Sequence, residues 1–139
     1  MSDVPELPDD WTQLVAAARE VRCRAYAPYS SHCVGAALRT TDGRIFTGCN
    51  VENVSYGLTI CAERVAMCTA VAAGSTAPEV ICVSLSGQPV PCGSCRQFLI
   101  EFNPELMVLL DDLSSADPPE RIWLYDLLPR AFRLNHDAQ

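Results

Sequence analysis

Two cysteine motifs lie at the predicted starts of successive helices, and they constrain the fold more than any other feature of the sequence. Cys61 opens a predicted helix over 61–73, and Cys92 opens another over 92–102. The short apolar run 80–85 separates them and is expected to be a buried strand. In strand–helix–strand crossovers, both helix starts lie beyond the carboxyl ends of strands, at one edge of the sheet. The two motifs are therefore expected to meet there.

The other predicted elements complete a mixed sheet with helices on its faces. Asp42-Gly43 is a strong hairpin signal between two β-type runs. Asp10 and Gln13 have the spacing of a capping box at the start of the first helix. Gly74 suits the position just after a helix end. The remaining elements are an amphipathic helix over 11–25, β-type runs over 33–41 and 44–49, a loop over 50–60, a strand over 106–110, a loop over 111–120 and a short helix over 124–128.

Length and composition bound the class of protein. The chain has 139 residues, which predicts one domain over 1–139, with a core of about 11–132. No apolar run approaches the length of a membrane helix, so no membrane partner is expected. The net charge of −7 argues against nucleic-acid binding, and the absence of Lys excludes Schiff-base chemistry. The acidic start lacks a signal-peptide pattern, so the eight cysteines are expected in a reducing cytoplasm.

Three of the cysteines have the pattern of a catalytic metal site. Cys92 and Cys95 are three residues apart and share a helix face, and Cys61 supplies a third thiolate. Three protein ligands leave one position of tetrahedral zinc open, as catalytic sites do. Zinc with three thiolates has a formal charge of −1, which weakens activation of water. The two helix N-termini are expected to offset that charge, together with Arg64 and Arg96, which lie beside the ligands and are expected to hydrogen-bond their sulfur atoms.

Glu63 is the candidate proton carrier. Residues two apart do not share a helix face, so Cys61 is expected at the helix cap, which lets Glu63 lean over the metal. Zinc activates a water molecule, and a carboxylate beside that water can take up its proton and pass it on. Two other interpretations remain open: a thioredoxin-like redox couple and a structural zinc site closed by a fourth cysteine. The cysteines expected to be ordinary core or surface residues are Cys23, Cys33, Cys49, Cys68 and Cys82.

Over about 11–132 the sequence resembles the cytidine deaminases, in their small homotetrameric form. The motifs that carry the resemblance are Pro28-Tyr29-Ser30, Val34-Gly35-Ala36-Ala37, Gly48-Cys49-Asn50-Val51-Glu52-Asn53, Ser55-Tyr56, Cys61-Ala62-Glu63, Pro91-Cys92-Gly93-Ser94-Cys95 and Leu127-Leu128-Pro129-x-x-Phe132. The pairing of Cys-Ala-Glu with Pro-Cys-x-x-Cys is the signature of zinc-dependent deaminases. The resemblance implies an α/β fold, a three-layer α-β-α sandwich with a mixed sheet of about five strands.

The resemblance also implies an activity and a set of roles. The activity is zinc-dependent hydrolytic deamination of cytidine and 2′-deoxycytidine, in pyrimidine salvage, by a homotetramer with one Zn²⁺ per chain. Glu63 would pass protons from water to N3 of cytosine and to departing ammonia. The other implied roles are metal ligation by Cys61, Cys92 and Cys95, hydrogen bonding of the thiolates by Arg64, contact with the ribose hydroxyls by Asn50 and Glu52, contact with the pyrimidine edge by the Ala62 backbone, and contact with a neighbouring subunit's site by Phe132.

The sugar-side residues can also be argued from their spacing. Asn50 and Glu52 are two apart after a predicted strand, so in extended chain both face the same way. Alone, they would be read as a turn Asn and a solvated Glu. His32 and Cys33 stand where the family usually has Phe-Pro. His32 is therefore a candidate wall of the nucleoside site, with an exposed loop position as the alternative.

The sequence leaves open three alternatives to the deamination of free cytidine. A relative acting on a modified cytosine nucleoside, such as an aminoacyl-nucleoside antibiotic, would share the metal site. An enzyme editing cytosine in nucleic acid would need a basic groove and flanking aromatics. The charge of −7 and an aromatic content of 7% argue against that. A zinc-stabilised binding module would not need Glu63.

Overall fold

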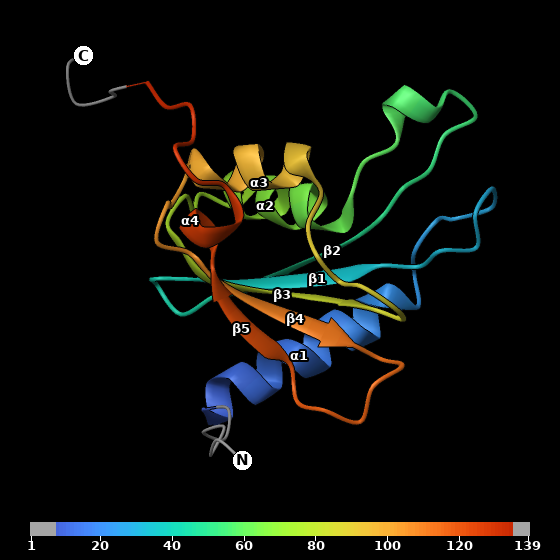
Figure 1. The fold of residues 1–139 in the computed structure, drawn as a ribbon, viewed down its shortest axis with the longest axis horizontal. Helices are drawn as coiled ribbons and strands as arrows, with labels where there is room; N and C mark the ends of the chain where they lie inside the picture. The colour runs from blue at the N-terminus through green and yellow to red at the C-terminus, as the bar shows by residue number, and fades with distance from the viewer. Residues whose placement is uncertain (1–7, 135–139) are drawn as a thin grey trace.

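The computed structural model describes residues 8–134 (Figure 1). Its elements, in chain order, are α1 (Asp9–Arg22), β1 (Gly35–Thr40), β2 (Ile45–Cys49), the 3₁₀ turn η1 (Tyr56–Leu58), α2 (Ala62–Ala72), β3 (Pro78–Leu85), α3 (Gly93–Ile100), β4 (Met107–Asp112), β5 (Glu120–Trp123) and α4 (Leu124–Leu127). None of the helices in this range is long and apolar enough to cross a bilayer.

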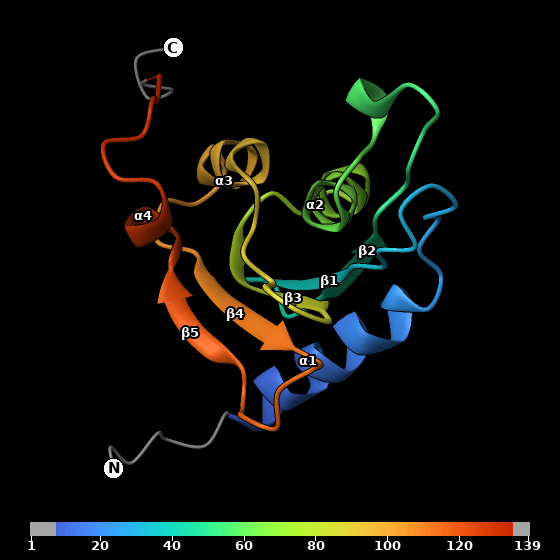
Figure 2. The ribbon, with the colours of Figure 1, turned by 45° about the vertical axis from the view of Figure 1, so that its right-hand side comes forward.

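The five strands form one mixed sheet in the order β2-β1-β3-β4-β5. β1 is antiparallel to both β2 and β3, β3 and β4 are parallel, and β5 is antiparallel to β4. Helix α1 covers one face of the sheet, and α2 and α3 cover the other (Figures 1 and 2). Each face has its own cluster of buried apolar side chains. The predicted three-layer α-β-α sandwich with a mixed five-stranded sheet is confirmed.

Two glycines let helices lie close against the sheet. A Cβ on Gly48 would lie 2.4 Å from the backbone N of Ala66, and a Cβ on Gly35 would lie 2.0 Å from the carbonyl oxygen of Ala18. Neither backbone atom can move aside, so both positions require glycine. The Gly48 contact seats α2 on β2, and the start of α2 carries the first cysteine motif.

The local signals were right for the hairpin and wrong for the first helix cap. β1 and β2 pair antiparallel around a turn in which Gly43 has a φ of 85°, as Asp42-Gly43 predicts. The capping box is not present: α1 begins at Asp9 after Pro8, and no side chain caps it. Asp10 instead forms an ion pair with Arg39 of β1. The Asp10 carboxylate, which the local spacing predicted to cap the helix, therefore binds a residue that is distant in the sequence.

Strand β5 is the element that no local pattern located. Its residues, Glu120–Trp123, begin at the end of an expected loop and fill the positions before the expected last helix, to which no element was assigned. Four residues are too few to show an alternation, and pairing with β4 supplies the backbone partners. The strand is thus fixed by the neighbouring strand rather than by its own sequence.

Candidate metal centre and active site

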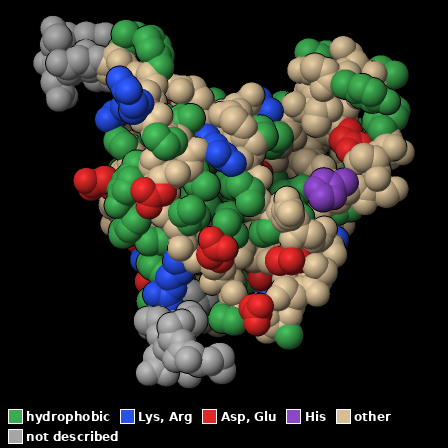
Figure 3. Space-filling model, in the orientation of Figure 1, with side chains coloured by type: hydrophobic (Ala, Val, Ile, Leu, Met, Phe, Trp, Pro, Cys, Tyr) green, Lys and Arg blue, Asp and Glu red, His purple; other side chains and the backbone are tan. Residues whose placement is uncertain are grey.

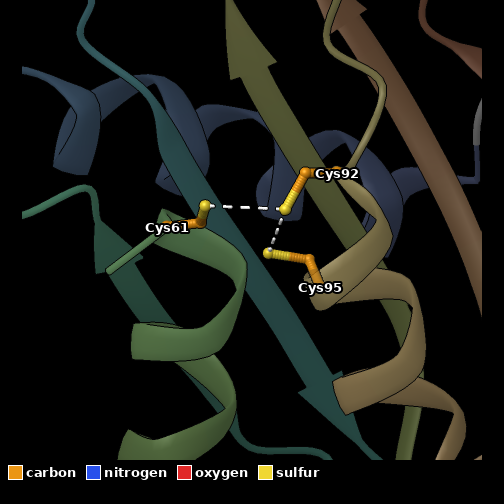
Figure 4. Close-up of side chains that lie close together, drawn as sticks. All are labelled: Cys61, Cys92 and Cys95. Carbon is orange, nitrogen blue, oxygen red and sulfur yellow. Dashed lines mark hydrogen bonds between the residues drawn. The ribbon is translucent and has the colours of Figure 1, made fainter. Parts of the chain in front are cut away.

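Three cysteines converge as the sequence predicts. The Sγ atoms of Cys61 and Cys92 are 3.8 Å apart, and those of Cys92 and Cys95 are 3.6 Å apart (Figure 4). All three sulfurs lie within 4.8 Å of one another. Within residues 8–134, which include all eight cysteines, no further Cys, His or carboxylate joins the group. A structural site closed by a fourth cysteine is therefore not what these residues form.

The topology explains this convergence. β2 and β3 are both antiparallel to β1, so they run in the same direction. α2 follows β2 and α3 follows β3, so both helices begin at the same end of the sheet. Cys61 is the N-cap of α2 and Cys92 is the N-cap of α3, both in extended backbone conformation. The expectation that Cys61 lies outside the helical geometry is confirmed.

The donor set fits zinc. Thiolate sulfur is a preferred ligand for Zn²⁺, and a set of three leaves one tetrahedral position for water or substrate. A hydrogen bond from the Cys95 thiol, then the nearby Arg64, lowers the pKa of Cys61 to about 5. The same hydrogen bond and burial raise the pKa of Cys95. Of the three, Cys61 therefore favours the thiolate form, which is the form that binds a cation.

The two arginines beside the ligands behave differently. The Nη2 atom of Arg64 lies 3.6 Å from the Sγ of Cys61, so Arg64 contacts a thiolate as predicted. The prediction that Arg96 also contacts sulfur is wrong. Arg96 donates to the carbonyl oxygen of Pro91 at 2.8 Å and to that of Leu127 at 2.7 Å. Its side chain points from α3 toward α4, where carbonyl oxygens are better acceptors than sulfur.

Glu63 lies in the first turn of α2 and is almost fully buried, with 4% of its surface exposed. Burial raises its pKa, because the charged form loses solvation. Glu63 lines the same cavity as Cys61 and Cys92. A buried carboxyl group thus lies beside the sulfur cluster, where a proton carrier is needed.

The cavity has a volume of about 270 Å³ and opens between the helical body and the projecting segment 50–60; Figure 3 shows the surface hollowed there. It contains most of the residues that the sequence assigned to a nucleoside site. The lining residues are His32, Val34, Asn50, Glu52, Thr59, Cys61, Ala62, Glu63, Val83, Leu85, Gln88, Val90 and Cys92. Val83, Leu85, Gln88 and Val90 were not singled out from the sequence, although their place directly before Cys92 could have indicated them.

Asn50 and Glu52 lie in extended chain and line the cavity together, as their spacing predicts. The Oδ1 of Asn50 accepts from the backbone N–H of Val34 at 2.9 Å, and its Nδ2 donates to the carbonyl oxygen of His32 at 2.8 Å. Glu52 accepts hydrogen bonds from the loop before β1, chiefly from Ser30, which lower the pKa of its carboxyl group. Both side chains are thus held in place by the loop that ends at β1.

Of the five residues predicted to bind the substrate, Phe132 is the one that does not line this cavity. Its side chain is 72% exposed, and its carbonyl oxygen accepts from the Nε2 of Gln97 at 2.9 Å. The segment after α4 therefore runs along α3 and presents the ring to solvent. Phe132 therefore does not pack into the core of its own chain.

Comparison with known proteins agrees with the site. Residues 9–110 match the family model of the cytidine and deoxycytidylate deaminase zinc-binding region. Cytidine deaminases from Mycobacterium tuberculosis and Sporosarcina psychrophila are 43% and 41% identical over 132 and 126 residues, covering 93% and 88% of this chain and 95% and 91% of theirs. The crystal structure of cytidine deaminase from Burkholderia pseudomallei, 47% identical, has a TM-score of 0.82 and covers 87% of this chain and 98% of that one. The chain therefore belongs to the cytidine and deoxycytidylate deaminase family.

Proposed function

We propose that this chain catalyses the zinc-dependent hydrolytic deamination of cytidine and 2′-deoxycytidine to uridine and 2′-deoxyuridine, with release of ammonia. The observation that carries the proposal is the buried Glu63 carboxyl in one cavity with the three-cysteine cluster. Relatives named cytidine deaminase, which cover almost the whole chain, support the choice of substrate.

Cys61, Cys92 and Cys95 would hold one Zn²⁺ per chain, since no other described residues form such a group. When bound, zinc activates a water molecule for attack on C4 of the cytosine. Arg64, close to the Cys61 sulfur, offsets part of the negative charge of three thiolates. The N-termini of α2 and α3 add their partial positive charges at the same place.

Glu63 carries the protons of the reaction. Its carboxylate accepts a proton from the attacking water and delivers it to N3 of the cytosine ring, which makes C4 more electrophilic. It then takes the second proton from the new hydroxyl group on C4 and passes it to the amino group, so that the C4 carbonyl forms as the C4–N bond breaks and ammonia leaves. Burial keeps bulk water away from Glu63, so its proton goes to the substrate rather than to solvent.

The rest of the cavity recognises the nucleoside. Asn50 and Glu52 hold ribose hydroxyls, and the backbone of Ala62 contacts the pyrimidine edge. His32 forms a wall of the site. No Lys or Arg lines the cavity, so a free nucleoside suits it better than a nucleotide with a phosphate.

The working unit is a homotetramer of single-domain chains, with sites built from several subunits. Two exposed apolar regions support this assignment. One is the projecting segment 50–60, in which Val54, Tyr56 and Leu58 are 76%, 78% and 65% exposed. The other is Phe132, which would reach a neighbouring subunit's cavity. In the cell, the reaction would belong to pyrimidine salvage in the cytoplasm, without nucleic-acid or membrane partners.

The test is an ultraviolet assay of cytidine deamination, with zinc measured per chain in the same samples. Glu63→Ala should keep the zinc and the fold and abolish turnover. The matched control is Glu105→Ala at an exposed position, which should retain activity. Cytidine deamination by Glu63→Ala at the parental rate would refute the assignment. Comparing the deamination rates of cytidine and an aminoacylated cytosine nucleoside would show whether a modified substrate is preferred.

A further inference from the structure

Ser30 is the centre of a hydrogen-bond network beside the candidate site. Its backbone N–H donates to Oε1 of Glu52 at 3.1 Å, and the N–H of Tyr29 donates to the same oxygen at 3.0 Å. The Ser30 hydroxyl donates to the other carboxylate oxygen, Oε2. Three donors from two adjacent residues thus fix both oxygens of one exposed carboxylate.

The same hydroxyl connects Glu52 to two other residues that line the cavity, His32 and Asn50. Ser30 Oγ accepts from the backbone N–H of His32 at 3.0 Å, and the carbonyl oxygen of His32 accepts from Asn50. Ser30 itself does not line the cavity that contains Glu63. It lines an adjoining cavity together with Glu52, and it acts on a ligand beside Glu63 through the residues that it holds.

These hydrogen bonds also determine how many acceptor positions remain free on the Glu52 carboxylate. A carboxylate has about four lone-pair positions, two on each oxygen. Oε1 of Glu52 uses both positions for the N–H groups of Tyr29 and Ser30, and Oε2 uses one for the Ser30 hydroxyl. One acceptor position is left, and it can take one hydroxyl group.

We infer that Ser30 is a positioning residue that aims the single remaining acceptor of Glu52 at one sugar hydroxyl, and so sets the discrimination between nucleosides with and without it. This rests on the proposed role of Glu52 as a sugar-binding residue. Without the Ser30 hydroxyl, the carboxylate loses a charge-assisted hydrogen bond and can rotate. Substrate binding must then order it, and that cost appears in KM rather than in kcat.

The test measures kcat and KM of Ser30→Ala with cytidine, 2′-deoxycytidine and 2′,3′-dideoxycytidine. KM for cytidine should rise about tenfold while kcat changes by less than about twofold. KM for 2′,3′-dideoxycytidine should stay unchanged, because that nucleoside lacks both hydroxyls. Ser30→Thr keeps a hydroxyl and should restore the parental KM. Ser31→Gly is the matched control, since Ser31 has a φ of 61° that glycine adopts readily.

Two results would overturn the inference. One is a parental KM for cytidine in Ser30→Ala; the other is an equal rise in KM for all three nucleosides. Glu52→Gln separates this failure from failure of the proposed function. If Glu52→Gln leaves the KM for cytidine unchanged, the sugar-binding role of Glu52 is wrong. If Glu52→Gln raises that KM and Ser30→Ala does not, only the role of Ser30 is wrong.

Discussion

The guanidinium of Arg64 lies 3.6 Å from the sulfur of Cys61, one helical turn into the helix that Cys61 caps. The same guanidinium donates to the carbonyl oxygen of Thr59 at 3.5 Å, so it is held from two directions. The contact with Cys61 raises the pKa of Arg64 further, and the group remains charged at every working pH. A permanent positive charge therefore lies against one of the three sulfur ligands.

This contact predicts that Arg64→Gln lowers zinc affinity about 10- to 100-fold, the usual effect of losing a group that supports a metal ligand. The loss follows because the thiolate loses its only described cationic neighbour within hydrogen-bond distance. Competition with a chromophoric chelator measures it. Arg24→Gln, at an exposed position on another part of the chain, is the control. Equal affinities of the two variants would contradict the role of Arg64.

Asp42 predicts a pH dependence of stability. Hydrogen bonds from the hydroxyls of Thr40 and Ser75 hold the pKa of its carboxyl well below the ordinary value. Because the carboxyl group has a lower pKa in the folded state, it stabilises the fold fully at pH values above its unfolded pKa of about 4. This stabilisation is lost as the pH falls from there through the pKa of the folded state. Asp42→Asn should therefore lose less stability than the parent below about pH 4.

Denaturant midpoints at neutral and acidic pH check this expectation. Asp126→Asn, on the exposed side of α4, is the matched control and should keep the parental pH dependence. If the denaturant midpoints of the parent and of Asp42→Asn fall equally with pH, the hydrogen bonds from these hydroxyls do not stabilise the hairpin turn.

The sequence predicted those features that depend on a few neighbouring residues. The Asp42-Gly43 turn, the helix end before Gly74 and the capping position of Cys61 were all correct, because each is decided by backbone conformation over a few residues. The convergence of the cysteines was also correct, since the order of strands and helices places both helix starts at one sheet end.

The incorrect and missing predictions all depend on tertiary partners. Asp10 pairs with Arg39 rather than capping α1, and Arg96 bonds two carbonyl oxygens rather than sulfur. β5 exists because β4 offers it backbone partners. The hydrogen bonds of Ser30 to Glu52 join positions 22 apart in the chain, and no spacing pattern indicates them. The pattern of neighbouring residues carries no information on these contacts between distant parts of the chain.

His32→Phe should tighten cytidine binding about fivefold, since a larger apolar ring buries more surface against the nucleoside. The backbone of His32 is bonded to Ser30 and Asn50, so the substituted ring should occupy the same place on the cavity wall. Calorimetric titration of cytidine into Glu63→Ala, with and without His32→Phe, measures binding without turnover. Zinc content should be equal in both. Unchanged or weaker binding would show that His32 is not part of the nucleoside site.

Phe132 and Glu63 together test whether sites are shared between subunits. If Phe132 acts in a neighbouring subunit's cavity, Phe132→Ala should raise KM, and Glu63→Ala should abolish turnover. Mixed assemblies of the two variants would then contain cavities that combine an intact Glu63 with an intact Phe132 from another chain. Unfolding and refolding the variants together should therefore give a fraction of sites with parental KM. If the mixture shows only the KM of Phe132→Ala, then Phe132, which lies outside the cavity of its own chain, serves no neighbouring one either.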